Sequence, residues 1–239
     1  MKKDNLKRVA IVTVAGALFG SIALAPVSQA ATKSRYISVS AEGTVKVSPD
    51  AVRINASVST VAGTTKDALA ATATSASAVR AAFLLQGVAS RDIATQSVTV
   101  YPEYNYTQDK GSVLIGYRAS QSFVVITRKA TTAGIVVDAI VTAGGDNLQL
   151  NGVTPFVLDS TKATVSARTA AVKNAKAKAA SYASLLGIKL GKVNYLIENS
   201  SPSVYPPIMS VTKDSAGSTQ IDLGLQDVTV SISVQWALI

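Results

Sequence analysis

Four carboxylate side chains are candidates for general acid and base catalysis. Glu42, Asp50, Glu103 and Asp159 each lie at a turn or at the end of a predicted element. A glycosidase needs only two such side chains, held a fixed distance apart across the scissile bond. The same positions suit structural roles, because Asp50 follows a proline in a turn and Asp159 precedes a helix. We favour turn, cap and strand-end roles, and a carboxylate-dependent hydrolase is the alternative.

Half of the eight tyrosines gather in one part of the chain, at Tyr101, Tyr104, Tyr106 and Tyr117. They lie on two predicted strands joined by residues 105–111, so we expect them around one hairpin. Aromatic rings with a polar tip bury a large area at low entropic cost, which suits interfaces and sugar stacking. Packing of the rings on their own strands is the other interpretation. The four tyrosines are candidate interface or ligand residues.

Arg168 interrupts the apolar seam that we predict along the longest helix. A guanidinium placed there needs a partner, since an unpaired buried charge is costly. A bound anion would make Arg168 the anchor of a small-ligand site, whereas a neighbouring carboxylate, a carbonyl or simple snorkelling would make it structural. The other members of the predicted seam are Val165, Val172, Ala175, Ala179, Tyr182 and Leu186.

Cysteine and histidine are both missing from the 239 residues. Their absence excludes thiolate nucleophiles, disulfides, Cys/His zinc sites and every Ser-His-Asp arrangement. The glycines at 144–145 and 187 lack the context of a phosphate-binding loop and are predicted helix C-caps. The carboxylates show no metal-ligand spacing. We therefore predict no catalytic residues, no metal site and no cofactor.

The first thirty residues have the order of an export signal. Four Lys or Arg residues precede an uncharged run at 9–24, and Ser28 and Ala30 suit the cleavage site of a signal peptidase. We expect the mature chain to span 31–239, without lipidation and without an integral membrane segment. Removing Asp4 and the four basic residues leaves 19 basic and 13 acidic side chains, a net charge of +6. This modest charge, without long basic runs, argues against nucleic-acid binding and permits weak attraction to anionic envelope polymers.

Along the mature chain, segments in which apolar and polar residues alternate are predicted strands. Segments with apolar residues at three- and four-residue spacing are predicted helices. Two antiparallel hairpins are expected, the first across Ser48-Pro49-Asp50 and the second across residues 105–111. The fold class is α+β: largely antiparallel sheet, with two long helices and one shorter helix packed on it. Strands are predicted at 35–47, 52–58, 93–104, 113–127, 148–158, 188–197 and 228–239, and helices at 64–86, 131–142 and 160–186.

Residues 199–226 form a long predicted loop with three prolines and two glycines. It exceeds the roughly 12–15 residues usual for connections inside a compact domain, which indicates a functional or flexible segment.

Five features in order resemble the SIMPL-domain family. They are ISVSAEGTV at 37–45 followed by Pro49-Asp50, YPEY at 101–104, GYRAS at 116–120, the Ala-rich helix around 167–179, and the LG pairs at 186–187 and 190–191. The resemblance covers 35–239 and departs only slightly, at Ala41, where many relatives have glycine. It implies a SIMPL-type fold and an exported envelope or periplasmic protein with no established catalytic residues. Family members include a periplasmic immunogenic protein, proteins linked to oxidative-stress protection, and proteins that form large ring-like oligomers.

These observations lead to one expectation about function. We expect an exported, non-enzymatic cell-envelope protein that acts by homo-oligomerisation or by binding an envelope partner, and that supports envelope or oxidative-stress tolerance. The alternatives are a carboxylate-dependent envelope hydrolase and a protein that binds a small ligand or anion at Arg168.

Overall fold

A computed structural model describes residues 35–109, 111–199, 203–205 and 219–239. The predicted signal segment at 1–30 lies outside the described residues, as does most of the predicted loop at 199–226. Residues 35–239 form one compact unit. The described residues of this unit form two antiparallel sheets and three α-helices, so the predicted α+β class is confirmed.

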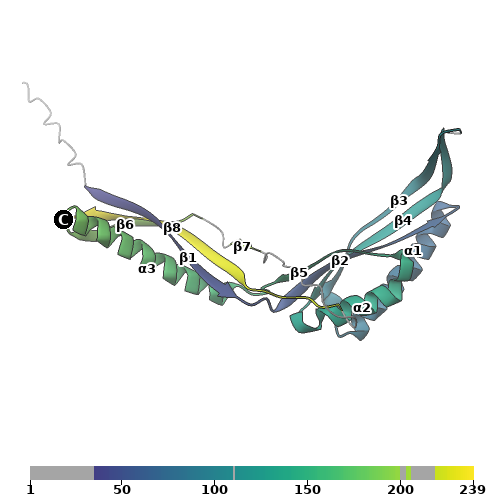
Figure 1. The fold of residues 1–239 in the computed structure, drawn as a ribbon, viewed down its shortest axis with the longest axis horizontal. Helices are drawn as coiled ribbons and strands as arrows, with labels where there is room; N and C mark the ends of the chain where they lie inside the picture. Colours follow the sequence, from purple (N-terminus) through teal and green to yellow (C-terminus); the bar gives the residue numbers. More distant parts are fainter. Residues whose placement is uncertain (1–34, 110, 200–202, 206–218) are drawn as a thin grey trace, which may run out of the picture. The chain divides into compact units, whose positions relative to one another are not determined.

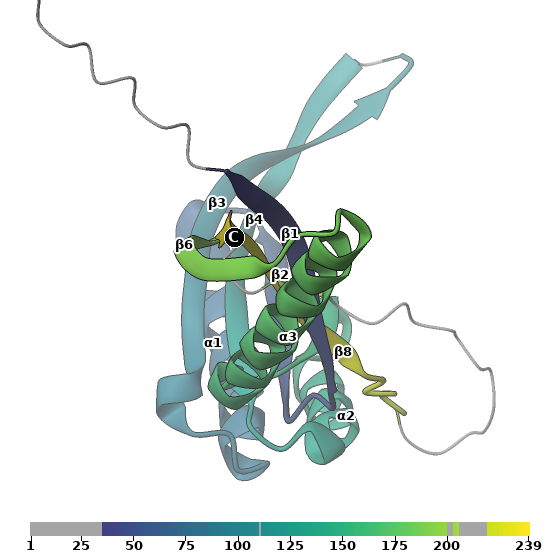
Figure 2. The ribbon, with the colours of Figure 1, turned by 90° about the vertical axis from the view of Figure 1, so that its left-hand side faces the viewer.

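The first sheet has the strand order β1 (Tyr36–Val47), β8 (Gln226–Leu238) and β6 (Leu190–Glu198). The short strand β7 (Ser203–Tyr205) also pairs with β8. Helix α3 (Thr161–Leu185) packs along β1 and β8 on one face of this sheet (Figure 2). Val230, Ile232, Val234 and Trp236 alternate along β8 and pack in a core beneath α3, and Val228 is also buried.

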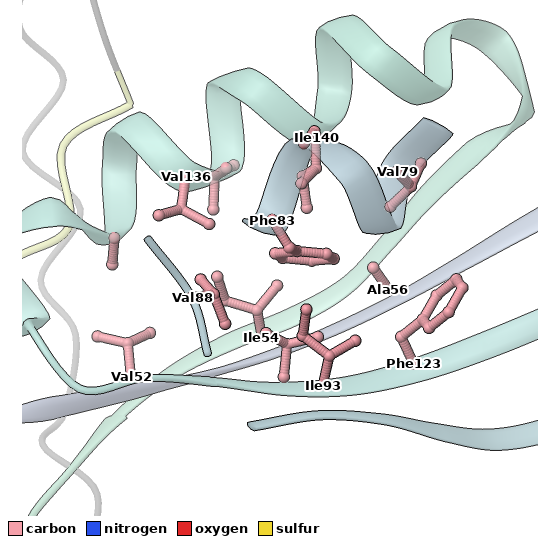
Figure 3. Close-up of a cluster of buried hydrophobic side chains, with 14 of the residues drawn as sticks. Val52, Ile54, Ala56, Val79, Phe83, Val88, Ile93, Phe123, Val136 and Ile140 are labelled. Carbon is pink, nitrogen blue, oxygen red and sulfur yellow. The ribbon is translucent and has the colours of Figure 1, made fainter. Parts of the chain in front are cut away.

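The second sheet has the order β3 (Ile93–Thr107), β4 (Gly111–Thr127), β2 (Ala51–Ala62) and β5 (Leu148–Phe156). Helices α1 (Thr65–Leu85) and α2 (Ala133–Gly144) pack together on one face (Figure 1). The side chains between the helices and the strands form the larger core (Figure 3). It includes Ile54 of β2, Phe83 of α1, Phe123 of β4 and Ile140 of α2.

Local signals place the ends of these elements. Thr64 caps α1 by accepting a hydrogen bond from the amide of Asp67 at 3.1 Å. At the end of α2, Gly145 has a φ of 51°, which favours glycine. Asp159 Oδ1 accepts from the amide of Thr161 at 2.9 Å where α3 begins. Short 3₁₀ turns occur at Ser90–Asp92, Ala130–Thr132 and Gly145–Asn147.

The first predicted hairpin is wrong, whereas the second is confirmed as β3 and β4. Strand β1 pairs with β8, from Tyr36 opposite Ala237 to Val47 opposite Gln226. Strand β2 pairs with β4 and β5 in the other sheet. The intervening Ser48-Pro49-Asp50 therefore crosses between sheets. Both strands alternate as predicted, but alternation carries no information about which strand lies alongside.

The predicted seam of α3 is displaced around the helix. Of the predicted seam, Ala175 and Ala179 are buried, whereas Val165, Val172, Tyr182 and Leu186 are exposed. The other buried residues of α3 are Thr164, Ala167, Ala171 and Ala183. Small side chains let α3 approach the sheet closely: a Cβ added to Gly43 of β1 would lie 2.1 Å from the carbonyl oxygen of Ala167. Close approach selects alanine for the buried face and leaves the larger residues outside.

Helix α1 is long and apolar enough to cross a membrane by length and composition alone, with a mean hydropathy of 1.4 over its most apolar window. A core helix can meet the same criterion. Residues Ala68, Thr72, Ala76, Val79 and Phe83 of α1 are buried in the unit, and the buried Thr72 hydroxyl donates to the carbonyl of Ala119 on β4 at 3.1 Å. These contacts place α1 in the core of the second sheet.

Candidate interaction surface

Strands β3 and β4 continue beyond the rest of their sheet. Strand β2 ends at Ala62, opposite Tyr117 of β4. Past that point, among the described residues, 103–107 and 111–116 pair only with each other. We call these two segments the ribbon, and Figures 1 and 2 both show it extending past β2. A two-stranded hairpin is at best marginally stable in water without a covered face.

Large apolar side chains of the ribbon are exposed. Tyr104 lies opposite Leu114, and Tyr106 lies two residues along β3, so these three side chains share one face. Their exposed fractions are 56%, 46% and 77% for Tyr104, Leu114 and Tyr106. The register shifts beside Tyr104 and leaves Ile115 without a cross-strand partner, as a bulge that is also exposed. The ribbon thus presents apolar area with no covering layer in the described structure.

The other two candidate tyrosines lie where the ribbon joins the sheet. Tyr117 is opposite Pro102 and half-buried, and strand alternation puts it on the face of Tyr104 and Tyr106. Tyr101 is opposite Arg118 and exposed, on the other face. The structure therefore brings three of the four predicted tyrosines to one face and separates Tyr101 from them.

An ion pair holds the base of the ribbon. Arg118 of β4 donates from Nε and Nη2 to the two carboxylate oxygens of Glu103 on β3, at 2.9 and 2.8 Å. Nη1 of Arg118 also donates to the hydroxyl of Ser59 on β2 at 3.3 Å. The hydrogen bond from Arg118 lowers the pKa of the Glu103 carboxyl, and the same bond raises the pKa of Arg118. The pair joins Glu103, the first ribbon residue of β3, to β4 and, through Ser59, to β2.

Gly116 marks the point where the ribbon leaves the sheet. Its φ is 152°, and a Cβ there would lie 2.6 Å from the carbonyl oxygen of Ala62, the last residue of β2. Glycine is required at this close approach, and it directs the two strands away from β2.

The four carboxylates considered for acid and base chemistry lie on separate elements. Glu103 pairs with Arg118, and Asp50 Oδ1 accepts from the amide of Leu158 at 2.8 Å. Asp159 accepts from Thr161, which lowers the pKa of its carboxyl, and Glu42 is exposed on β1. A general acid needs a raised pKa. The shifts at Glu103 and Asp159 run in the opposite direction.

Arg168 pairs with a carboxylate. Its Nε and Nη2 donate to the two carboxylate oxygens of Glu198, at the end of β6, at 2.8 and 3.1 Å. The Arg168 side chain is 48% exposed, because it lies beside the buried alanine face of α3 and not within it. An anion bound at this guanidinium would compete with Glu198. The structural interpretation of Arg168 accounts for its position.

Sequence reasoning missed the aliphatic part of the ribbon, Val113, Leu114 and Ile115, all of which are exposed. The signal was present, because three consecutive apolar residues in a strand cannot all face one core. Sequence reasoning also missed the partners of Glu103 and Arg118, which lie 15 residues apart. Among the described residues, no group of three or more Asp or Glu side chains could hold a metal ion.

Comparison of the sequence with known proteins identifies a family. The family model of SIMPL, described as a protein of unknown function (DUF541), matches residues 37–236. The chain belongs to the SIMPL family. The match spans both sheets and the ribbon, so the resemblance based on five short features is confirmed.

Three relatives have sequences similar to this chain. The 26 kDa periplasmic immunogenic protein of Brucella melitensis biotype 1 is 33% identical over 195 residues, which cover 80% of this chain and 77% of the relative. The protein of the same name from Brucella abortus strain S19 matches equally. The uncharacterized protein YggE of Edwardsiella ictaluri is 30% identical over 143 residues, 56% of this chain and 58% of the relative.

Proposed function

We propose that this protein is exported to the periplasm and acts there without bond-making chemistry, by associating with further copies of itself through the ribbon. The names of the Brucella relatives support the location, since both are called periplasmic. The sequence order of an export signal supports it independently. The observation that carries the mode of action is the exposed apolar ribbon.

The ribbon suits association for two physical reasons. Tyr104, Tyr106 and Leu114 offer a contiguous apolar face, and covering such a face removes it from water. The Glu103–Arg118 pair and the glycine at 116 hold the ribbon in one orientation before binding. A surface ordered in advance loses less conformational entropy on association than a loop that must be ordered.

A role in envelope or oxidative-stress tolerance belongs to the same proposal as its physiological outcome. The chain contains no cysteine and only two methionines, one of them Met1. Direct scavenging by thiols or thioethers is therefore minimal, and protection would be indirect, through the assembled protein.

Light scattering across a concentration series tests the association. We expect the exported chain to form a discrete assembly, and the double variant Tyr104→Ser/Tyr106→Ser to shift toward monomer at the same concentrations. Truncating aromatic anchors in an interface typically weakens association by about tenfold or more for each residue. The matched control is Tyr182→Ser, since Tyr182 is 45% exposed on α3, away from the ribbon.

Three outcomes would contradict the proposal: a wild-type chain that stays monomeric at every concentration, an assembly that the ribbon variant leaves intact, or equal disruption by Tyr182→Ser. If the wild type is monomeric but retains a partner from the envelope through Tyr104 and Tyr106, binding of that partner replaces self-association as the function of the ribbon. Circular dichroism of each variant verifies that the fold is retained.

A further inference from the structure

Four segment ends meet at one end of the first sheet. Strand β1 begins there, β8 ends there, and α3 turns into β6 there. The amide of Leu238 donates to the carbonyl of Arg35 at 3.0 Å, and Lys189 and Ile239 exchange two backbone hydrogen bonds at 3.1 and 2.9 Å. We call this group the basic end; Figure 1 shows it at the marked C-terminus. Its exposed side chains include Arg35, Leu185, Leu186, Lys189, Lys192 and Ile239.

The charged side chains of the basic end all have one sign. The segments that form it, 35–41, 178–197 and 228–239, contain no Asp or Glu, and they contribute Arg35, Lys178, Lys189 and Lys192. Lys178 is held by the carbonyl of Ser40 at 3.1 Å. Among the described residues, none of the other three cations is in an ion pair. More widely, residues 160–197 carry seven Lys or Arg and no acidic residue.

Apolar side chains project between these cations. Leu185 is 80% exposed and Leu186 66% exposed, where α3 turns toward β6. Ile239, which exchanges backbone hydrogen bonds with Lys189, is 74% exposed. Nothing in the described structure covers these three side chains. Leucines on a turn flanked by lysines have the pattern of a shallow membrane-surface contact, with apolar groups at the acyl boundary and cations at the headgroups.

We propose that the basic end docks on the surface of an anionic phospholipid bilayer. Arg35, Lys189 and Lys192 would lie at the phosphate level, while Leu185 and Leu186 enter the boundary between headgroups and acyl chains. The contact is peripheral and reversible, since a few leucines and cations bind far more weakly than a spanning helix. It uses a different surface from the ribbon and does not rest on self-association.

Lipid is favoured over a soluble polyanion by the leucines. A nucleic acid or an anionic polysaccharide would be bound by the cations alone and would leave Leu185 and Leu186 in water. An anionic bilayer binds the cations at its headgroups and the leucines at its acyl boundary. Binding to lipid should therefore depend on both the lysines and the leucines, whereas binding to a soluble polyanion should depend on the lysines alone.

Vesicle sedimentation tests the docking with the exported chain, purified without detergent. Binding to phosphatidylglycerol vesicles should exceed binding to phosphatidylcholine vesicles, and it should fall as salt is raised. Lys189→Gln/Lys192→Gln should weaken the partition coefficient about 30-fold. Leu185→Ser/Leu186→Ser should weaken it about tenfold or more.

Matched controls come from the two ends of the other long helix, α1. Leu85 of α1 is 85% exposed, and Lys66 is exposed on the same helix. Leu85→Ser and Lys66→Gln should leave vesicle binding unchanged.

The docking would be overturned if the chain failed to bind phosphatidylglycerol vesicles at low salt, or if it bound phosphatidylcholine vesicles equally well. Loss of binding in the control variants as large as in the lysine and leucine variants would also overturn it. Binding lost in the lysine variant, kept in the leucine variant and competed by soluble polyphosphate would overturn the lipid in favour of a soluble polyanion. None of these results bears on the ribbon, whose test is assembly in solution.

Discussion

At the scale of single residues, the charged pairs show how folded geometry sets ionisation. Asp92 is 8% exposed, and its two carboxylate oxygens accept from Nε and Nη2 of Arg128 at 2.7 and 2.8 Å. The hydrogen bonds from Arg128 lower the pKa of Asp92, and they outweigh the opposing effect of burial. The carboxylate is thus more stable in the folded chain than in the unfolded chain.

The sign of the resulting pH dependence follows directly. The folded pKa of Asp92 lies below its unfolded value, so the stabilisation is present above the unfolded pKa and is lost as pH falls through the folded pKa. We expect Asp92→Asn to lower the free energy of unfolding by about 1–2 kcal/mol at neutral pH. The difference from wild type should shrink in acid. Urea unfolding at several pH values measures it.

Asp146→Asn is the matched control for this prediction, because Asp146 is exposed on a 3₁₀ turn. It should leave the pH profile of unfolding unchanged. A pH-independent loss in Asp92→Asn would mean that packing, and not the charge of Asp92, carries the effect.

At the scale of elements, the packing of α3 on its sheet depends on small side chains along the buried face of the helix. Its buried face consists almost entirely of alanine, and Ala175 is fully buried in the core of the first sheet. A helix held this close to a sheet has no space for a longer side chain without a shift of the backbone.

We predict that Ala175→Leu lowers the free energy of unfolding by about 1–3 kcal/mol or more, because the added atoms force α3 away from β1 and β8. The control is Ala177→Leu, at an exposed position two residues along the same helix. It should change stability by less than about 0.5 kcal/mol. Urea unfolding followed by Trp236 fluorescence measures both. Equal stability of the two variants would show that the alanine face is loosely packed.

At the scale of the whole molecule, the two cores belong to one compact unit, residues 35–239. The chain passes from the first sheet to the second through three residues, 48–50, and returns to the first through four, 157–160. The buried Gln226, at the start of β8, donates from Nε2 to the carbonyl of Pro155 on β5 at 2.7 Å. These links join β8 and β1 to the second sheet, and they predict that both cores unfold together.

The single tryptophan makes this cooperativity measurable, since Trp236 lies in the core beneath α3. Phe83→Ala removes a fully buried ring from the other core and should cost about 3–5 kcal/mol. We expect the transitions followed by Trp236 fluorescence and by far-UV circular dichroism to shift together. A Trp236 transition that stays in place while the circular dichroism transition splits would show two independent units.

Much of the candidate surface was predictable from local pattern. The tyrosines at 101–117 do gather around one hairpin, because neighbouring strands joined by a short loop usually pair. The extension of the ribbon beyond its sheet was not predictable, because it depends on where β2 ends relative to β4. Arg168 follows Ala167, which is buried, so a small rotation of α3 determines whether the arginine faces the core or lies beside it. That rotation is set by the close packing of the alanines on the sheet.

The sequence by itself determined the order and kind of the elements. Alternation, helical spacing, caps such as Thr64 and turn glycines such as Gly145 act within a few residues, so they can be read locally. The tertiary structure alone decided the partners: β1 beside β8, 179 to 201 residues away along the chain, and Glu103 beside Arg118. Every strand offers the same backbone donors and acceptors, so the choice among partners depends on packing of the whole chain.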